Sequence, residues 1–141
     1  MKKLIIFLFL FNFTNLYSSE LKFEKIFDDL NKPWSLSFID RDNVIITEKT
    51  GKLLTLNLKN KNMNEIQHNL SLISLGQGGL LDVLYNNNQV YVSYSENRGN
   101  WETSTSVAKG SFDKSKINFD NIFRAEPPID SGYHFGSRLT I

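Results

Sequence analysis

The chain has 141 residues, of which 40% are hydrophobic and 22% are charged, as in ordinary globular proteins. This composition argues against intrinsic disorder. The net charge of +1 gives no sign of nucleic acid or an acidic membrane as a partner. The sequence contains no cysteine, which excludes disulfides and thiolate zinc sites and leaves the redox compartment open.

The N-terminus has the layout of a secretory signal peptide. Two lysines precede an apolar run over residues 4–13, and small polar residues follow up to Ser19. The run is far shorter than the ~20 residues of a membrane-spanning helix, and an uncleaved anchor or a buried strand is the alternative. We therefore predict a signal peptide over residues 1–19, no stable membrane anchor, and a periplasmic or secreted protein that begins near residue 20.

The rest of the chain has the alternation of apolar and polar side chains that is typical of β-strands. Turns rich in Asn, Asp and Gly separate the apolar runs, and no stretch has the periodicity of an amphipathic helix. We predict an all-β chain of antiparallel meanders. The predicted strands cover residues 34–38, 44–47, 54–58, 80–85, 90–94, 103–110 and 117–123.

A pair of apolar residues split by one position recurs at intervals of roughly 50 residues, as in the blades of a β-propeller. The pairs are Leu36 with Phe38, Val83 with Tyr85, and Leu139 with Ile141. We predict one blade over residues 34–69, a second over 79–125 and a third that begins near Gly136. Chance similarity between strands is the alternative.

The same alternation predicts one continuous β core that includes Trp34, Leu36, Phe38, Leu81, Val83 and Tyr85. A propeller blade buries its faces only against neighbouring blades, so two blades and a short third would leave apolar faces in water. The sequence also ends inside the strand predicted at 139–141. We therefore expect a truncated reading frame, or else assembly with other copies. By itself, such a chain is expected to be poorly soluble and inactive.

The first segment with possible chemistry is Gly-Gln-Gly-Gly-Leu-Leu over residues 76–81. Glycine permits backbone conformations that other residues avoid, so this turn can bring Gln77 close to a ligand. A tight turn between two blades is the structural alternative. A phosphate-binding loop is disfavoured because no helix follows to supply its N-terminus.

The second segment places His134 between two aromatic residues, just before the strand predicted at 139–141. In propellers the start of the innermost strand lies at the mouth of the central channel, and an imidazole can accept a proton near neutral pH. A partly buried structural histidine is the alternative. His68 lies in a polar stretch, for which we predict a solvated turn or an outer strand.

Four segments together resemble the soluble aldose (glucose/sorbosone) dehydrogenases, from about residue 30 to the last residue. They are Pro33–Phe38, Ile46–Lys49 with Gly51, Gly76–Val83 and His134–Leu139. The first two are shared by several propellers. Gly-Gln-x-Gly-Leu-Leu and His-x-Gly-x-Arg-Leu together are the specific signature.

The resemblance implies a six-bladed propeller that binds pyrroloquinoline quinone (PQQ) and calcium. Such an enzyme oxidises the anomeric hydroxyl of an aldose sugar to a lactone and passes hydride to the quinone. The resemblance makes His134 the general base and places Gln77 in the sugar pocket, while we expect Arg138 to pair with a carboxylate or with backbone. It places the quinone and calcium ligands in later blades, outside this chain, and leaves the electron acceptor open.

Two other functions remain possible for a propeller with these residues. A calcium-dependent lactonase would need acidic ligands that converge on the channel, but we assign Glu48 to blade geometry and Asp82 to strand pairing. A non-catalytic propeller that binds a ligand or a partner in the cell envelope would not require a histidine at the channel.

Overall fold

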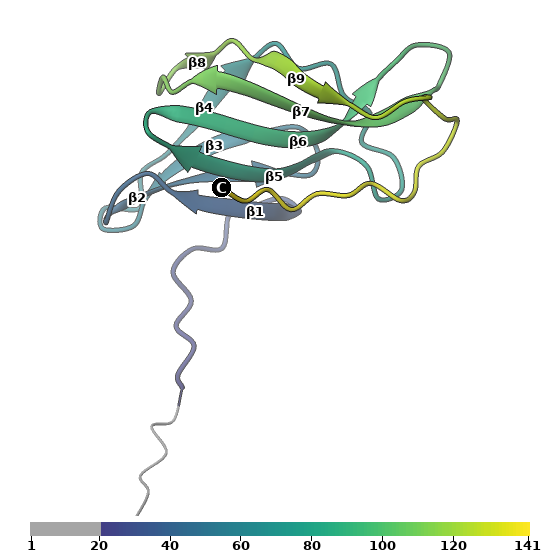
Figure 1. Ribbon diagram of the computed structural model, residues 1–141. Helices are drawn as coiled ribbons and strands as arrows, with labels where there is room; N and C mark the ends of the chain where they lie inside the picture. Colours follow the sequence, from purple (N-terminus) through teal and green to yellow (C-terminus); the bar gives the residue numbers. More distant parts are fainter. Residues whose placement is uncertain (1–20) are drawn as a thin grey trace, which may run out of the picture.

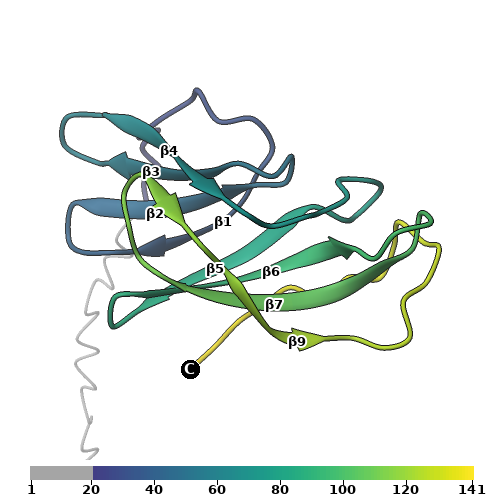
Figure 2. The same ribbon diagram turned by 90° about the horizontal axis from the view of Figure 1, so that it is seen from above.

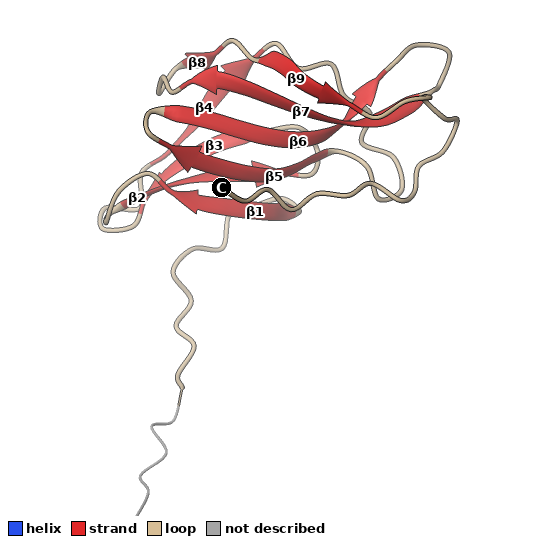
Figure 3. Cartoon of the chain, in the orientation of Figure 1, coloured by secondary structure: helices blue, strands red, loops and turns tan. Residues whose placement is uncertain are grey.

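The computed structural model describes residues 21–141, which form two β-sheets joined by turns and loops (Figure 1). The signal peptide predicted over residues 1–19 lies outside the described residues. Figure 3 shows strands and loops throughout the described part and no helix, so residues 21–141 contain no helix that could cross a membrane. The predicted all-β class is confirmed.

The first sheet is an antiparallel meander with one added strand. Its order is β1 (Pro33–Phe38), β2 (Asn43–Glu48), β3 (Leu53–Asn57), β4 (Met63–His68) and, parallel to β4, β8 (Lys116–Ile117). His68 ends β4, the outer strand of the meander, which was one of the two predicted alternatives, and there it pairs with Ile117 of β8. Its Nε2 lies 2.7 Å from the carbonyl oxygen of Gly51.

The second sheet is fully antiparallel, in the order β5 (Leu80–Asn86), β6 (Gln89–Asn97), β7 (Thr103–Ser111) and β9 (Asp120–Arg124). The hairpin between β5 and β6 turns at Asn87 and Asn88, whose φ angles are 48° and 61°. A two-residue type I′ turn requires this left-handed backbone at both positions, and Asn tolerates it better than most residues. The predicted strand–turn–strand layout follows from this turn.

The chain links the outer edges of the two sheets between β7 and β9. It leaves the second sheet, pairs as β8 with β4, and returns as β9 (Figure 1). The amide of Asn69 donates to the carbonyl oxygen of Phe119 at 3.0 Å and accepts from the backbone N–H of the same residue at 2.7 Å. This reciprocal pair fixes the crossing point.

The main core lies between the two sheets, which pack side by side (Figure 2). Each apolar side chain that is fully buried there stabilises the fold by roughly 1.5–3 kcal/mol relative to an exposed one. The buried members of this core include Ile45, Leu53 and Ile66 of the first sheet and Leu80, Val90 and Val92 of the second. Two meanders packed in this way agree with the predicted pair of neighbouring propeller blades.

The core prediction is wrong for β1. Trp34, Leu36 and Phe38 are 45%, 54% and 60% exposed, because the opposite face of β1 meets the second sheet. On that face the hydroxyl of Ser35 donates to Asp82, and the hydroxyl of Ser37 accepts from the backbone N–H of Tyr85 at 3.0 Å. The small serines let β1 and β5 approach closely.

On β5 the same core prediction is confirmed for Leu81 and Val83, which are buried, while Tyr85 is half-buried against the core.

The far face of the first sheet is apolar and only partly covered. Val44, Ile46, Leu54 and Leu56 form a second buried cluster beneath Phe27, Leu30 and Leu58. Beside this cluster an apolar cleft of about 360 Å³ remains, with Leu36 and Phe38 in its lining. The expectation of an apolar blade face open to water is confirmed for this sheet.

The strand expected to open a third blade near Gly136 is not formed. Residues 130–141 contain no strand. The last residues bond to side chains of the second sheet: Ser93 donates its hydroxyl proton to the Ser137 carbonyl at 2.7 Å, and the Leu139 N–H donates to Asp82 at 2.5 Å. Because these backbone groups bond to side chains, the segment does not pair with β5 through backbone hydrogen bonds.

Candidate functional site

The glycine-rich segment before β5 folds directly against the segment that contains His134. Gly76 has a φ of 56°, and a Cβ there would lie 2.4 Å from the Gly132 carbonyl oxygen, so only glycine fits. The next backbone N–H, that of Gln77, donates to the same carbonyl at 2.7 Å. The two segments singled out in the sequence therefore touch.

The two predicted site residues are joined by a hydrogen bond. The backbone N–H of His134 donates to Gln77 Oε1 at 3.0 Å, across 57 positions of sequence. His134 has a φ of 67°, a left-handed conformation that is uncommon outside glycine and persists where neighbouring contacts hold it. Both side chains are exposed, which leaves the imidazole open to a ligand.

A small cleft of about 120 Å³ lies beside the imidazole. It is lined by Thr103, Ile129, Tyr133, His134 and Phe135, among others. The rings of Tyr133 and His134 are tilted against each other, with centroids 6.5 Å apart. An imidazole with an apolar and aromatic wall on one side and solvent on the other can take a proton from a hydroxyl placed between them.

Lys49 contacts the glycine-rich loop before β5, and the sequence did not predict this contact. Its ammonium donates to the Gly76 carbonyl, and its own carbonyl accepts from the Leu80 N–H at 3.2 Å. Gly79, with a φ of 149°, passes so close to Lys49 that a Cβ would lie 2.1 Å from the lysine carbonyl oxygen. The only signal in the sequence was the Ile-Thr-Glu-Lys segment of the family resemblance.

The two acidic candidates for a metal site have structural partners. Glu48 is buried and accepts the Asn31 N–H at 2.6 Å, while Asp82 is buried between Ser35 and Leu139. Arg138 lies 4.0 Å from Asp82 but is 85% exposed on its side chain, so the predicted pairing is present and weak. Within residues 21–141, no group of three His, Cys, Asp or Glu side chains is placed to hold a metal ion.

A buried carboxylate at the same end of the sheets was missed in the sequence. Glu96 accepts hydrogen bonds from Ser106 at 2.6 Å, from Asn121 at 2.9 Å and from the Arg124 guanidinium at 2.8 Å. Burial raises the pKa of Glu96, but the hydrogen bonds from Arg124 and Ser106 outweigh it and hold the pKa below its usual value. These contacts tie β9 to β6 and β7.

The phenol of Tyr94 belongs to the same network. Burial and the charge of Glu96 raise the pKa of Tyr94.

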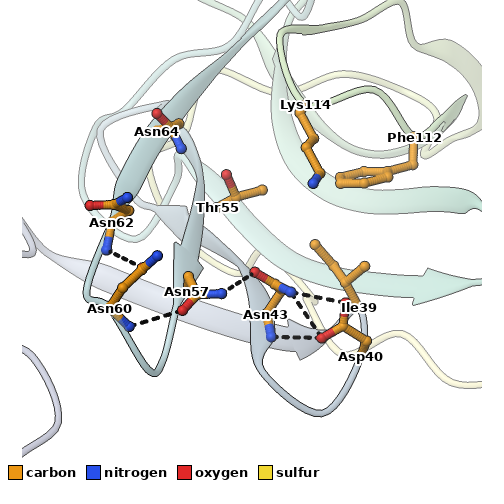
Figure 4. A pocket seen from close by; sticks show the side chains of 10 residues that line it. All are labelled: Ile39, Asp40, Asn43, Thr55, Asn57, Asn60, Asn62, Asn64, Phe112 and Lys114. Carbon is orange, nitrogen blue, oxygen red and sulfur yellow. Dashed lines mark hydrogen bonds between the residues drawn. The ribbon is translucent and has the colours of Figure 1, made fainter.

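A cleft of about 210 Å³ at the opposite end of the strands is rich in asparagine (Figure 4). Its side chains mainly cap their own turns. Asp40 accepts from the backbone N–H groups of Asp42 and Asn43, and Asn57 accepts from those of Lys59 and Asn60. The backbone hydrogen bond from Asp42 and the side-chain bond from Asn43 lower the pKa of Asp40. These are features of hairpin ends rather than of a reactive site.

The fold and the loop contacts define a β-propeller with a candidate ligand site on the loops at one end of its blades. Comparison with known proteins gives the family. Residues 30–141 match the model of the glucose/sorbosone dehydrogenases, and the chain belongs to that family. It is 33% identical over 125 residues to an aldose sugar dehydrogenase of Escherichia coli, covering 82% of this chain and 34% of that relative.

Solved structures agree with this assignment. The soluble aldose sugar dehydrogenase of Escherichia coli, in its apo form, matches with a TM-score of 0.76 and 30% identity, over 84% of this chain and 37% of that one. The PQQ-bound aldose sugar dehydrogenase of Streptomyces coelicolor matches in fold, with a TM-score of 0.64 and 16% identity, over 74% of this chain and 33% of that one. The chain spans about a third of the length of the curated relatives that it matches.

Proposed function

We propose that this chain is part of a dehydrogenase that oxidises the anomeric hydroxyl of an aldose to a lactone, with PQQ as hydride acceptor and calcium as a second cofactor. Membership of the glucose/sorbosone dehydrogenase family supports an oxidoreductase that acts on sugars. The Escherichia coli relative is an aldose sugar dehydrogenase. The Streptomyces coelicolor protein, which has the same fold, binds PQQ.

The observation that carries the proposal is the hydrogen bond between the backbone of His134 and the side chain of Gln77. It brings the exposed amide of Gln77 to the backbone of His134, whose imidazole is also exposed, so both residues lie on adjoining loops from distant parts of the chain. Because the Gln77 oxygen accepts from His134, the amide NH₂ group is left to donate to a sugar hydroxyl. No partner for this NH₂ group occurs among residues 21–141.

In the proposed reaction, a ring nitrogen of His134 removes the proton of the anomeric hydroxyl as the C–O bond becomes a carbonyl. PQQ, when bound, supplies the acceptor for the hydride that leaves the anomeric carbon. Residues 21–141 hold no group of three His, Cys, Asp or Glu side chains for a metal ion. The residues that hold calcium and the quinone are expected in later blades, as the family resemblance implies. This chain's contribution is to position the sugar and accept its proton.

The lactonase alternative has no support in this geometry, because Glu48 and Asp82 are occupied by backbone and hydroxyl donors.

The test is glucose oxidation by the protein expressed from its complete gene, with PQQ and calcium added, and with identification of the sugar product. The expected product is the lactone. A positioned general base contributes about 10²–10⁴-fold to the rate, so His134→Ala should lower kcat by that factor with an unchanged melting temperature. His68→Ala, at the outer strand, is the matched control and should retain kcat. Equal kcat in wild type and His134→Ala would overturn the base assignment.

We also propose export to the periplasm or the medium, followed by removal of residues 1–19. The support is the lysine pair and the apolar run in the sequence. Fractionation of cells and mass measurement of the mature N-terminus test this, and an unprocessed cytoplasmic protein would contradict it.

A further inference from the structure

The geometry points to Lys49 as a positioning residue of the site, whose ammonium fixes the peptide between Gly76 and Gln77 and thereby holds Gln77 and His134 in register. The expected effect of Lys49 on sugar oxidation rests on the proposed function, whereas its expected effect on the order of the two loops does not. Lys49 itself touches neither of the two site side chains through a hydrogen bond in residues 21–141. Its effect passes through the loop backbone.

The two ends of one peptide plane are held from different sides. The carbonyl of Gly76 accepts from the Lys49 ammonium, and the N–H of the same peptide, on Gln77, donates to the Gly132 carbonyl at 2.7 Å. A peptide is planar, so fixing both groups fixes its rotation. The Gln77 side chain leaves the backbone at this plane, and its oxygen then receives the His134 N–H at 3.0 Å.

The loop needs such an external hold because its sequence gives it little stiffness of its own. Glycines allow many backbone conformations, and ordering them costs more entropy than ordering other residues. Gly76 and Gly79 both have positive φ angles, and both are pressed against the carbonyl of another segment. The hydrogen bond from Lys49 is charge-assisted, which makes it stronger than one between two neutral groups.

Lys49 is itself well anchored on the first sheet. It directly follows β2, and its N–H donates to the Lys32 carbonyl at 3.0 Å. Its half-buried side chain passes along Trp34, with the ammonium 6.0 Å from the ring centroid, at the outer limit of a cation–π contact. The lysine therefore connects a rigid strand end of one blade to the loop that leads into the next.

The test compares Lys49→Met with Lys52→Met in the protein from its complete gene. Lys52 is the matched control, because it lies in the same turn and its side chain makes an exposed ion pair with Glu65 at 3.4 Å. Hydrogen exchange is measured in peptides that cover residues 74–80 and 131–136. Lys49→Met should exchange about tenfold faster in both, the effect of one lost charge-assisted hydrogen bond, and Lys49→Arg should restore most of the protection.

Kinetics with glucose, PQQ and calcium supply the second measurement. Lys49→Met should lower kcat/KM by about tenfold relative to Lys52→Met, at an equal melting temperature, since both the base and the sugar contact lose their position. Exchange equal to that of Lys52→Met would overturn the proposal. Lower kcat/KM without faster exchange would also overturn it, because Lys49 would then act on the ligand directly. Faster exchange in a protein whose wild type oxidises no aldose would retain the positioning role and reject the proposed function.

Discussion

The two ends of the strands differ in how far apart in the sequence their hydrogen-bonded residues lie. At the asparagine-rich end, many side-chain hydrogen bonds close within two or three residues: Asp40 accepts from the Asp42 N–H, and Asn57 accepts from the Asn60 N–H. The Lys59 ammonium reaches further there, to Asp42 across 17 positions. At the end that carries His134, hydrogen bonds join residues 27 positions apart, for Lys49 with Gly76, and 57 apart, for Gln77 with His134. Figure 1 shows the β5–β6 turn on one side of the molecule and the yellow loop after β9 on the other.

This difference indicates where a ligand site can form on such a scaffold. Short-range turns satisfy their own backbone groups and need little from the rest of the protein. Long-range loops exist only when both sheets are in place, and they bring side chains from separate segments to one point. A ligand site needs that convergence, so we place the chemistry at the long-range end.

The largest effect is expected from Gly79→Ala at the long-range end. The new methyl group would lie 2.1 Å from the Lys49 carbonyl oxygen, and the backbone at φ 149° disfavours alanine. Together these should lower the free energy of unfolding by about 2–4 kcal/mol. Gly99→Ala separates the two causes, because Gly99 has a φ of 83° and nothing within 4 Å of the new atom. It should cost about 1 kcal/mol. If urea denaturation gave the same loss of unfolding free energy for Gly79→Ala and Gly99→Ala, the close contact with Lys49 would not be the cause.

A smaller effect is expected from Glu96→Gln, which weakens the network that holds β9. We expect a loss of about 1–2 kcal/mol at neutral pH, a modest value because its partner Arg124 is half exposed. The folded-state pKa of Glu96 is lowered, so the carboxylate stabilises the fold above the ordinary carboxyl pKa. That stabilisation is lost as the pH falls through the lowered value.

The check for Glu96 is chemical denaturation from pH 7 down to pH 3. The difference between wild type and Glu96→Gln should be complete at pH 7 and shrink in acid. Glu65→Gln, which removes only the exposed pair with Lys52, should show almost no difference at any pH. A difference for Glu96→Gln that grows in acid would show that the sign of the pKa change is wrong.

The smallest effect belongs to the asparagine-rich end. Asn57→Ala removes acceptors for two backbone N–H groups, each at 3.0 Å, and should cost about 1 kcal/mol because water can replace them. Glucose kcat/KM should stay unchanged in this variant, since the site lies at the other end of the strands. A tenfold loss of kcat/KM at normal stability would break the division between the two ends.

Much of the fold could be predicted from local pattern. The apolar alternation and the Asn87-Asn88 turn were enough for β5 and β6, and β-branched residues were enough for β2. The single strand predicted at residues 117–123 is wrong, because Lys116–Ile117 pair as β8 with β4 of the first sheet and Asp120–Arg124 pair as β9 with β7 of the second. A two-residue strand that pairs with a distant partner carries no periodic signal of its own. The strand expected at residues 139–141 failed because alternation does not supply the partner that a strand needs.

The buried face of β1 shows a second limit of sequence patterns. Alternation marks one face of a strand as apolar but does not say which neighbour covers it. The apolar face, with Leu36 and Phe38, turned out to be exposed, while Ser35 and Ser37 face the second sheet. Likewise, the proximity of Gln77 and His134 followed from family resemblance rather than from any local rule, because their contact depends on how two blades pack.

The most direct measurement is a double-mutant cycle on kcat, with Gln77→Ala, His134→Ala and the double variant assayed on glucose with PQQ and calcium. In the proposed mechanism, Gln77 affects kcat by holding His134 in place. Gln77→Ala alone should then lower kcat by about tenfold, as expected for a misplaced base, and have almost no further effect once the imidazole is gone. The double variant should therefore match His134→Ala. A kcat in the double variant equal to the product of the two single effects would show that the residues act independently and would contradict the account.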